Sequence, residues 1–298
     1  FLRKYPIKKP SLEMAKSYFN YAMPVIILSV VSIISLNIDK IMIGYFWTST
    51  EVGYYFTVQK ITEFIIILSS SVAALLFPTI SELHSLNNIK MLNKITILAE
   101  RYISMIMIPP VFVIIIFVYP TIKIMLDKSF LAAAPVLIIL TFYSFIYGIK
   151  VPYNSLINGI NRPAIGAKIG LLICFVNIPL NLLFIPKNGL LSSFNLHGAQ
   201  GAALATVISI IVGYIGIKII ANKLTGIRLF QSHTPKHIAA GIISAITLYI
   251  LAYRTFLFPD IRWFHLIIFS FLGLILYIGI LYIFKEFNKK DLYFFLNI

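Results

Sequence analysis

The chain has 298 residues, of which 59% are hydrophobic and only 12% are charged, and its mean hydropathy is +0.92. A water-soluble domain is about 45–50% apolar and about 25% charged. The composition therefore excludes a soluble enzyme and a disordered tail, and it indicates a membrane protein. The net charge of +15 does not argue for nucleic-acid binding, because the charges must first be located relative to the bilayer.

Eight stretches are long and apolar enough, or nearly so, to cross a bilayer as helices, which takes about 20 residues each. Runs of this length and uniformity exclude the short alternating strands of a membrane β-barrel. The sequence therefore predicts an all-α polytopic membrane protein with short connections. In chain order the predicted spans are 18–38, 52–77, 102–119, 132–149, 164–185, 199–220, 238–253 and 264–284.

Lys and Arg residues are distributed unevenly between the connections. Most of the 25 lie in alternate connections, and this bias predicts that these connections and both termini of the chain are cytoplasmic. A multi-pass protein of the plasma membrane with anionic lipid headgroups as neighbours is therefore expected. The basic connections are 3–16, 90–101, 150–168, 218–236 and 285–290.

The basic stretch 221–237 predicts a cytoplasmic linker that divides the chain. Residues 1–225 are expected to form a six-span unit, and residues 226–298 the linker with two terminal spans. The chain begins with Phe1 and a basic, proline-broken segment without the pattern of a signal peptide. We therefore expect an N-terminal part of a longer protein to precede it.

Charged residues inside or beside a span are costly and indicate function by default. Asp39 and Lys40 end the first predicted span; the alternative is a helix-end pair that snorkels to the interface. Lys60 and Glu63 lie within the second span on one helical face. They are expected to face a partner helix or a watery cavity, and the alternative is a purely structural ion pair. An ammonium such as that of Lys60 can engage a phosphate.

Polar side chains recur every four residues at the end of the fourth predicted span and so share one helical face. This face predicts the cytoplasmic mouth of a cavity; the alternative is ordinary positively charged flanking. A second pair of amides four residues apart in the fifth span predicts hydrogen bonds between helices. The first set is Lys150, Asn154, Asn158 and Arg162, and the second is Asn177 and Asn181.

Small residues predict close helix contacts at two places, the GxxxG motif of 166–170 and the pair Gly201 and Ala205. Signatures of chemistry are missing from the sequence. The five histidines form no metal-binding pattern, Cys174 is the single cysteine, and there is no P-loop. We therefore expect no metal, no cofactor and no enzymatic activity.

Three stretches resemble the polysaccharide flippases, the Wzx-type branch of the MATE-like exporter superfamily. They are NIDKIMIGYFWTSTEVGYYFTVQKI (37–61), ALLFPTISEL (74–83), and the pair NLLFIPKNG and HGAQGAALATVIS within 181–209. In the third stretch, LLSSFNLH makes a longer connection than the family pattern has.

The resemblance implies that the chain is the second half of a fourteen-helix protein: a six-helix C-lobe plus two terminal helices, with the N-terminal lobe absent. Such proteins rock between inward-open and outward-open states and move a lipid-linked oligosaccharide to the outer leaflet. Lys60, Lys150 and Arg162 would then hold the polyprenyl (pyro)phosphate, with Asp39, Lys40 and Glu63 pairing or sensing ions. Asn154, Asn158, Asn177 and Asn181 would be polar groups of the cavity. Membrane lipids and a glycan polymerase or ligase are the expected partners, and nucleic acid is not.

Three alternatives stay open. A cation-coupled multidrug exporter of the same superfamily would favour an acidic, aromatic-lined cavity. A membrane-embedded glycan enzyme would need a catalytic base, usually on a long external loop. A fragment or subunit that does not transport by itself would need a partner.

Overall fold

The computed structural model describes residues 37–194, 196–255 and 261–287, together with a few positions before residue 37. These residues are helical and contain no strand, so the prediction of an all-α fold is confirmed. Seven helical stretches are long and apolar enough to cross a membrane, and they correspond to the last seven predicted spans. The first predicted span, 18–38, lies almost entirely outside the described residues.

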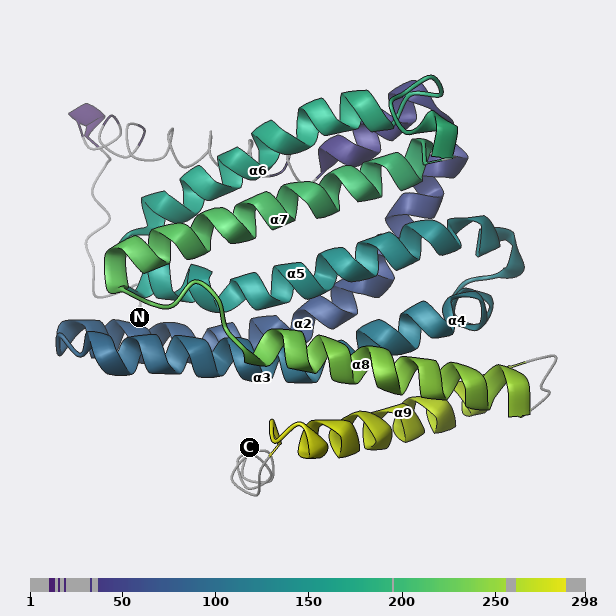
Figure 1. Ribbon diagram of the computed structural model, residues 1–298. Helices are drawn as coiled ribbons and strands as arrows, with labels where there is room; N and C mark the ends of the chain where they lie inside the picture. The colour runs from purple at the N-terminus through teal and green to yellow at the C-terminus, as the bar shows by residue number, and fades with distance from the viewer. Residues whose placement is uncertain are drawn as a thin grey trace, which may run out of the picture.

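The chain follows an up-and-down course through the bundle (Figure 1). A helical segment, 37–46, precedes the numbered helices. Two of these helices adjoin short helical segments: α4 directly follows α3, and the 3-10 helix η2 directly precedes α5. A π-helical turn, η4, ends α8. The elements are α2 (Ser49–Ser85), α3 (Ile89–Ile116), α4 (Val118–Met125), η2 (Lys128–Ala133), α5 (Ala134–Gly159), α6 (Pro163–Phe184), η3 (Ser192–Phe194), α7 (Gly198–Thr225), α8 (His233–Ile250), η4 (Leu251–Thr255) and α9 (Trp263–Ile283).

Several helices extend well beyond the apolar stretches that predicted them. The 37 residues of α2 span about 55 Å at 1.5 Å per residue, whereas the hydrocarbon core of a bilayer is about 30 Å thick. The connection between the predicted spans 52–77 and 102–119 is also mostly helical, with only the turn at 86–88 between α2 and α3. Hydropathy therefore locates the part of a helix that lies in the hydrocarbon core, but it does not locate the ends of the helix.

The connections gather at two ends of the bundle. The turns α2–α3 and α5–α6, the linker from α7 to α8 and the end of α9 lie together at the left of Figure 1. The η2 and η3 connections lie at the opposite end. Among the described residues, the basic connections that follow α2, α5 and α7 therefore share one end of the molecule, as the charge bias predicts. The cytoplasmic location of that end stays a prediction.

Helix α5 lies at the centre of the bundle and packs against α2, α3 and α7, while α6 lies against α7. Buried residues occur in every turn of α5, from Ala134 to Gly159. Small residues permit the closest approaches: a Cβ built on Gly148 would lie 2.0 Å from Met107 Sδ of α3. The core is thus a set of helix contacts around α5 that the small residues make close.

The two small-residue motifs behave differently. A Cβ on Gly201 would lie 2.3 Å from the carbonyl oxygen of Phe184, so α7 approaches the end of α6 closely there. A Cβ on Gly170 would have no atom within 4 Å, and one on Gly166 would have only an ordinary contact at 3.6 Å. The predicted close contact at Gly201 is confirmed, whereas the GxxxG motif of 166–170 makes none in the described chain.

Substituting these two glycines gives a matched pair of predictions. Gly201→Ala is expected to lower the free energy of unfolding by about 1–3 kcal/mol, because the methyl group forces the two helices apart. Gly170→Ala is expected to be neutral or to stabilise by up to about 1 kcal/mol, because alanine favours the helix. Unfolding in mixed micelles, followed by circular dichroism, measures both; equal losses would contradict the contact at Gly201.

The terminal helices α8 and α9 are attached to the bundle through α3. Ser104 Oγ and His237 Nδ1 lie 2.8 Å apart, and Lys236 Nζ donates to Glu286 Oε1 at 2.6 Å. Arg101 also bonds the backbone oxygen of Glu286. Burial alone would raise the pKa of the Glu286 carboxyl, but the hydrogen bond and charge of Lys236 outweigh it, so the pKa lies below its usual value. These polar contacts fix the basic end of the terminal pair to α3.

Candidate functional site

Cationic side chains from two elements gather on an exposed face of α2. Lys60 Nζ donates to the two carboxylate oxygens of Glu63 at 2.8 and 3.1 Å, and their side chains are 53% and 43% exposed. Lys40, from the segment 37–46, donates to Gln59 Oε1 at 3.3 Å. Lys40 and Lys60 each lie 5.5 Å from the ring centre of Phe56. The predicted pairing of Lys60 and Glu63 on one helical face is what the structure has.

Asp39 is the centre of a buried polar network and does not reach the surface. It is only 8% exposed, which is inconsistent with a snorkelling helix-end pair, and Lys40 bonds Gln59 in its place. Its carboxylate accepts hydrogen bonds from Tyr55 Oη at 2.8 Å, Thr206 Oγ1 at 2.8 Å and Asn181 Nδ2 at 2.6 Å. One carboxylate thus joins the segment 37–46 to α2, α6 and α7.

The two amides of α6 belong to the same network. Asn181 Nδ2 also donates to Asn177 Oδ1 at 2.9 Å, and Asn177 Nδ2 reaches Thr206 Oγ1 at 3.4 Å. Asn181 Oδ1 is buried without a hydrogen-bond partner in the described structure. The network therefore contains a carboxylate, a free amide oxygen and a hydroxyl, and oxygen ligands of these kinds suit hard cations. Sequence reasoning found the carboxylate and the amides separately and missed Tyr55 and Thr206.

The quoted sequence stretches also meet at the other end of the bundle. Trp47 Nε1 donates to the carbonyl oxygen of Ile185 at 2.6 Å, and its ring stacks on His197 with centres 4.8 Å apart. Glu51 Oε2 accepts from the backbone nitrogen of Ala199 at 3.2 Å. Residues 37–61 and 181–209 therefore form one contact region, with Asp39 within it.

The polar stripe of α5 becomes more exposed toward the end of the helix. Lys150 is buried at 8% exposure, Asn154 is half-buried and Asn158 is exposed. Lys150 Nζ lies 6.0 Å from the ring centre of Tyr147, which contacts Tyr143. In the described structure Lys150 has no carboxylate within ion-pair distance. Its ammonium is thus buried without a described carboxylate to neutralise its charge.

Arg162 does not belong to this stripe. Helix α5 ends at Gly159, Asn161 has a left-handed φ of +59°, and Arg162 is the N-cap of α6. The turn moves Arg162 off the four-residue repeat, so the prediction that all four residues share one helical face is wrong for it. Arg162 lies instead in a small surface pocket with His84 and Asn161.

The sequence analysis missed a second buried charge cluster, centred on Glu100 of α3. Glu100 is fully buried and accepts from Tyr214 Oη at 2.7 Å and Lys218 Nζ at 3.2 Å, as well as from Tyr153 Oη. Lys218 Nζ also lies 5.0 Å from the ring centre of each tyrosine. Tyr214 and Lys218 are four residues apart in an apolar span and so share one helical face. This spacing was the sequence signal that could have indicated the cluster.

The described part of the chain contains no group of three or more His, Cys, Asp or Glu side chains placed to hold a metal ion. Its charged side chains serve as electrostatic and hydrogen-bonding groups: two buried networks, at Asp39 and Glu100, and an exposed cationic face on α2. Such an arrangement can attract an anion to the exposed face and respond to a cation at Asp39.

Comparison with known proteins supports a flippase relationship. Residues 1–135 match the family model described as "Polysaccharide biosynthesis protein". The chain is 27% identical over 209 residues to the "Probable low-salt glycan biosynthesis flippase Agl15" of Haloferax volcanii, a match that covers 70% of this chain and 42% of that protein. It is 25% identical over 223 residues to "Probable flippase AglR" of the same organism, with coverages of 73% and 44%. The chain thus spans less than half the length of these relatives.

The fold is also shared with a solved structure. "Lipid II flippase MurJ, inward closed conformation" superposes with a TM-score of 0.76 at 18% sequence identity, over 94% of this chain and 57% of that one. At this identity the match establishes the fold, and the sequence matches establish the relationship. The resemblance expected from the sequence is therefore confirmed: the chain is related in sequence to probable glycan flippases, and its first 135 residues match the family described as polysaccharide biosynthesis proteins.

Proposed function

We propose that the chain is the C-terminal part of a flippase that moves a polyprenyl-(pyro)phosphate-linked oligosaccharide from the cytoplasmic to the outer leaflet by alternating access. In this proposal residues 1–225 supply one wall of the translocation pathway, and residues 226–298 supply the linker and two terminal helices. The related glycan flippases support this class of substrate.

The exposed Lys60–Glu63 pair is the observation on which the proposal depends. Lys60 is the twelfth residue of α2, about 16 Å from the start of the helix, and its side chain is 53% exposed. A charged pair inside a span is too costly to leave in lipid, and such residues face the interior of a bundle or a watery cavity. This face of α2 is therefore best explained as the wall of a polar pathway.

In this proposal two cations would serve the phosphate, Lys60 on the α2 wall and Lys150 on α5. Lys60 is exposed but paired with Glu63, so an anionic headgroup would compete with the carboxylate for it. Lys150 has no carboxylate within ion-pair distance among the described residues, and its buried ammonium lies beside Tyr147. Arg162, at the end of the bundle, would act at the mouth of the pathway. The oxygen ligands around Asp39 would sense the coupling cation.

The function is tested by the pool of lipid-linked glycan after deletion of the complete gene. Accumulation of the complete oligosaccharide-lipid on the cytoplasmic face, with loss of surface glycan, is expected. An unchanged pool with altered sensitivity to toxic organic cations would instead favour the multidrug exporter. No change in either would contradict a transport function for this protein in the cell.

Lys60→Ala is expected to reduce transport about tenfold with normal amounts of folded protein. The loss of one charge-assisted contact to a phosphate, at about 1.4 kcal/mol, corresponds to a factor of ten. Complementation of the deletion strain, scored by surface glycan, measures the effect. Lys128→Ala, at an exposed lysine of η2 that is not part of the α2 face, is the control and should transport normally. If the Lys60→Ala and Lys128→Ala variants transport equally well, Lys60 does not bind the substrate.

A further inference from the structure

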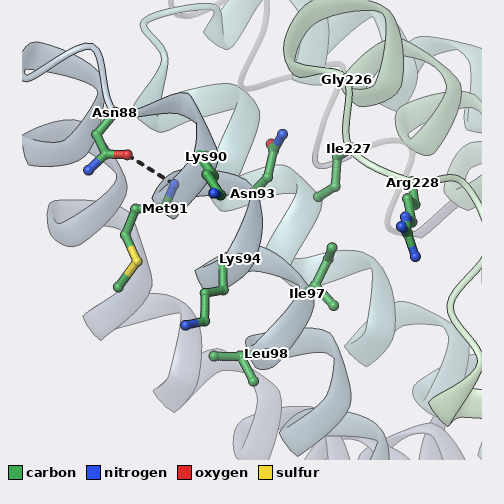
Figure 2. A pocket seen from close by; sticks show the side chains of 10 residues that line it. All are labelled: Asn88, Lys90, Met91, Asn93, Lys94, Ile97, Leu98, Gly226, Ile227 and Arg228. Atoms are coloured by element: carbon green, nitrogen blue, oxygen red, sulfur yellow. Dashed lines mark hydrogen bonds between the residues drawn. The ribbon is translucent and has the colours of Figure 1, made fainter.

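A basic pocket that includes no residue of the α2 face or of the two buried networks lies at the end of the bundle. It has a volume of about 680 Å³ and is formed by the first turns of α3 and the start of the linker after α7. Figure 2 shows two of its cationic side chains, Lys90 and Lys94, on α3 and the third, Arg228, on the linker. The other lining residues are Asn88, Met91, Asn93, Ile97, Leu98, Gly226 and Ile227.

The backbone at the end of α7 explains how Arg228 reaches this pocket. Gly226 caps the helix in the left-handed conformation, with φ at +72°, which glycine adopts without a steric penalty. Asn222 Nδ2 then holds the carbonyl oxygen of Ile227 at 2.7 Å, and Ile227 itself is buried at 1% exposure. Asn93 Nδ2 of α3 donates to the carbonyl oxygen of Thr225 at 2.7 Å. The linker is thus fixed against α3 with Arg228 exposed on its surface.

The electrostatics of the pocket are one-sided. Lys90, Lys94 and Arg228 are exposed, and the ten lining residues include no carboxylate. Among the described residues, none of the three cations has an acidic side chain within ion-pair distance. Asn93 Oδ1 is buried without a hydrogen-bond partner in the same part of the structure. The pocket therefore offers three positive charges that no described acidic side chain neutralises.

The position of the pocket matches the headgroup layer of a bilayer. Helix α3 has 28 residues, which is about 42 Å, against about 30 Å for the hydrocarbon core. Its first turns hold Lys90, Asn93 and Lys94, whereas the last three turns, from Met105 to Ile116, carry no charged side chain. These first turns therefore extend beyond the hydrocarbon, with Met91, Ile97 and Leu98 completing the wall beside the charges.

We propose that this pocket binds the headgroup of an anionic phospholipid. The three cations would attract the phosphodiester, and the apolar wall would contact the start of the acyl chains. The apolar wall favours a lipid over free phosphate, for which it would offer no partner. The site is separate from the proposed transport pathway, and a lipid bound there would fix the linker to α3.

Native mass spectrometry of the purified protein in detergent tests the proposal, because it resolves individual bound lipids. The probe is phosphatidylglycerol, with phosphatidylcholine as the uncharged comparison. A cation near an anionic lipid contributes about fivefold in affinity, so Lys94→Gln should weaken the first bound phosphatidylglycerol about fivefold. The double variant Lys94→Gln with Arg228→Gln should weaken it about 25-fold.

Lys223→Gln is the matched control, because Lys223 is exposed at the same end of α7 but does not line the pocket. It should change the affinity less than twofold, and all variants should keep the melting temperature of the parent. If Lys223→Gln weakens phosphatidylglycerol binding as much as Lys94→Gln does, the lipid is attracted by general surface charge. That result would overturn the pocket as a specific lipid site. Equal binding of phosphatidylcholine, or displacement by millimolar inorganic phosphate, would overturn the lipid headgroup as its occupant.

Discussion

Glu100→Ala is expected to lower the free energy of unfolding by about 3–5 kcal/mol, because it leaves a buried ammonium without its counter-ion. Glu100 accepts from Lys218 and two tyrosines and has no exposed surface. Lys218→Met alone should be comparably damaging, since it leaves the carboxylate uncompensated. Unfolding in mixed micelles, followed by circular dichroism, gives the values.

A double variant separates the energy of the Glu100–Lys218 interaction from the cost of burying each charged group alone. Glu100→Gln combined with Lys218→Met removes both charges but keeps an oxygen that can accept from the tyrosines. Its stability should return to within about 1–2 kcal/mol of the parent, because a neutral replacement avoids the desolvation cost. As a comparison, Lys60→Met breaks an exposed pair and should cost below about 1 kcal/mol. Additive losses in the double variant would contradict a coupled buried pair.

Asp39→Ala is expected to cost about 3–5 kcal/mol in unfolding free energy, because three donors lose one charged acceptor and hydrogen bonds to charged groups are worth about 1.5–3 kcal/mol each. The donors come from α2, α6 and α7, so the contacts between these helices should loosen together. The same micelle unfolding experiment measures the loss.

Asp39→Asn distinguishes a structural role from a coupling role. The amide keeps the size and one acceptor oxygen, so the loss of stability should be only about 1–2 kcal/mol. If Asp39 senses the coupling cation, transport by this variant should lose its dependence on the ion gradient, because an amide carries no charge. Transport that keeps its full ion dependence in Asp39→Asn would limit Asp39 to holding the helices together.

The fold was predictable because its strongest determinant is hydropathy, which is local in sequence. Seven predicted spans correspond to membrane-length helices, and the spacing of Lys60 and Glu63 predicted their pairing. Helix ends were less predictable, because the polar residues that follow an apolar stretch remain helical although their hydropathy gives no sign of it. The turn with a left-handed Asn161, which removes Arg162 from its expected face, has no hydropathy signal.

The buried networks were not predictable for a different reason. Asp39 and Asn181 are 142 residues apart, and Glu100 and Lys218 are 118 apart. Charge bias assigned Lys218 to the flank of a span, since the sequence does not show which distant carboxylate it meets. Only the packing of α3 against α5, and of α5 against α7, brings Glu100, Tyr153 and Lys218 together.

The attachment of the terminal helices to α3 has a mechanical consequence. Ser104 and Arg101 of α3 meet His237 and Glu286, while α9 packs mainly on α8. A rigid tilt of α3 would therefore carry α8 and α9 with it as a lever whose fulcrum lies at the basic end. The largest displacement would then occur at the far end of the pair, around Trp263, where the described packing against the end of α3 is mainly apolar.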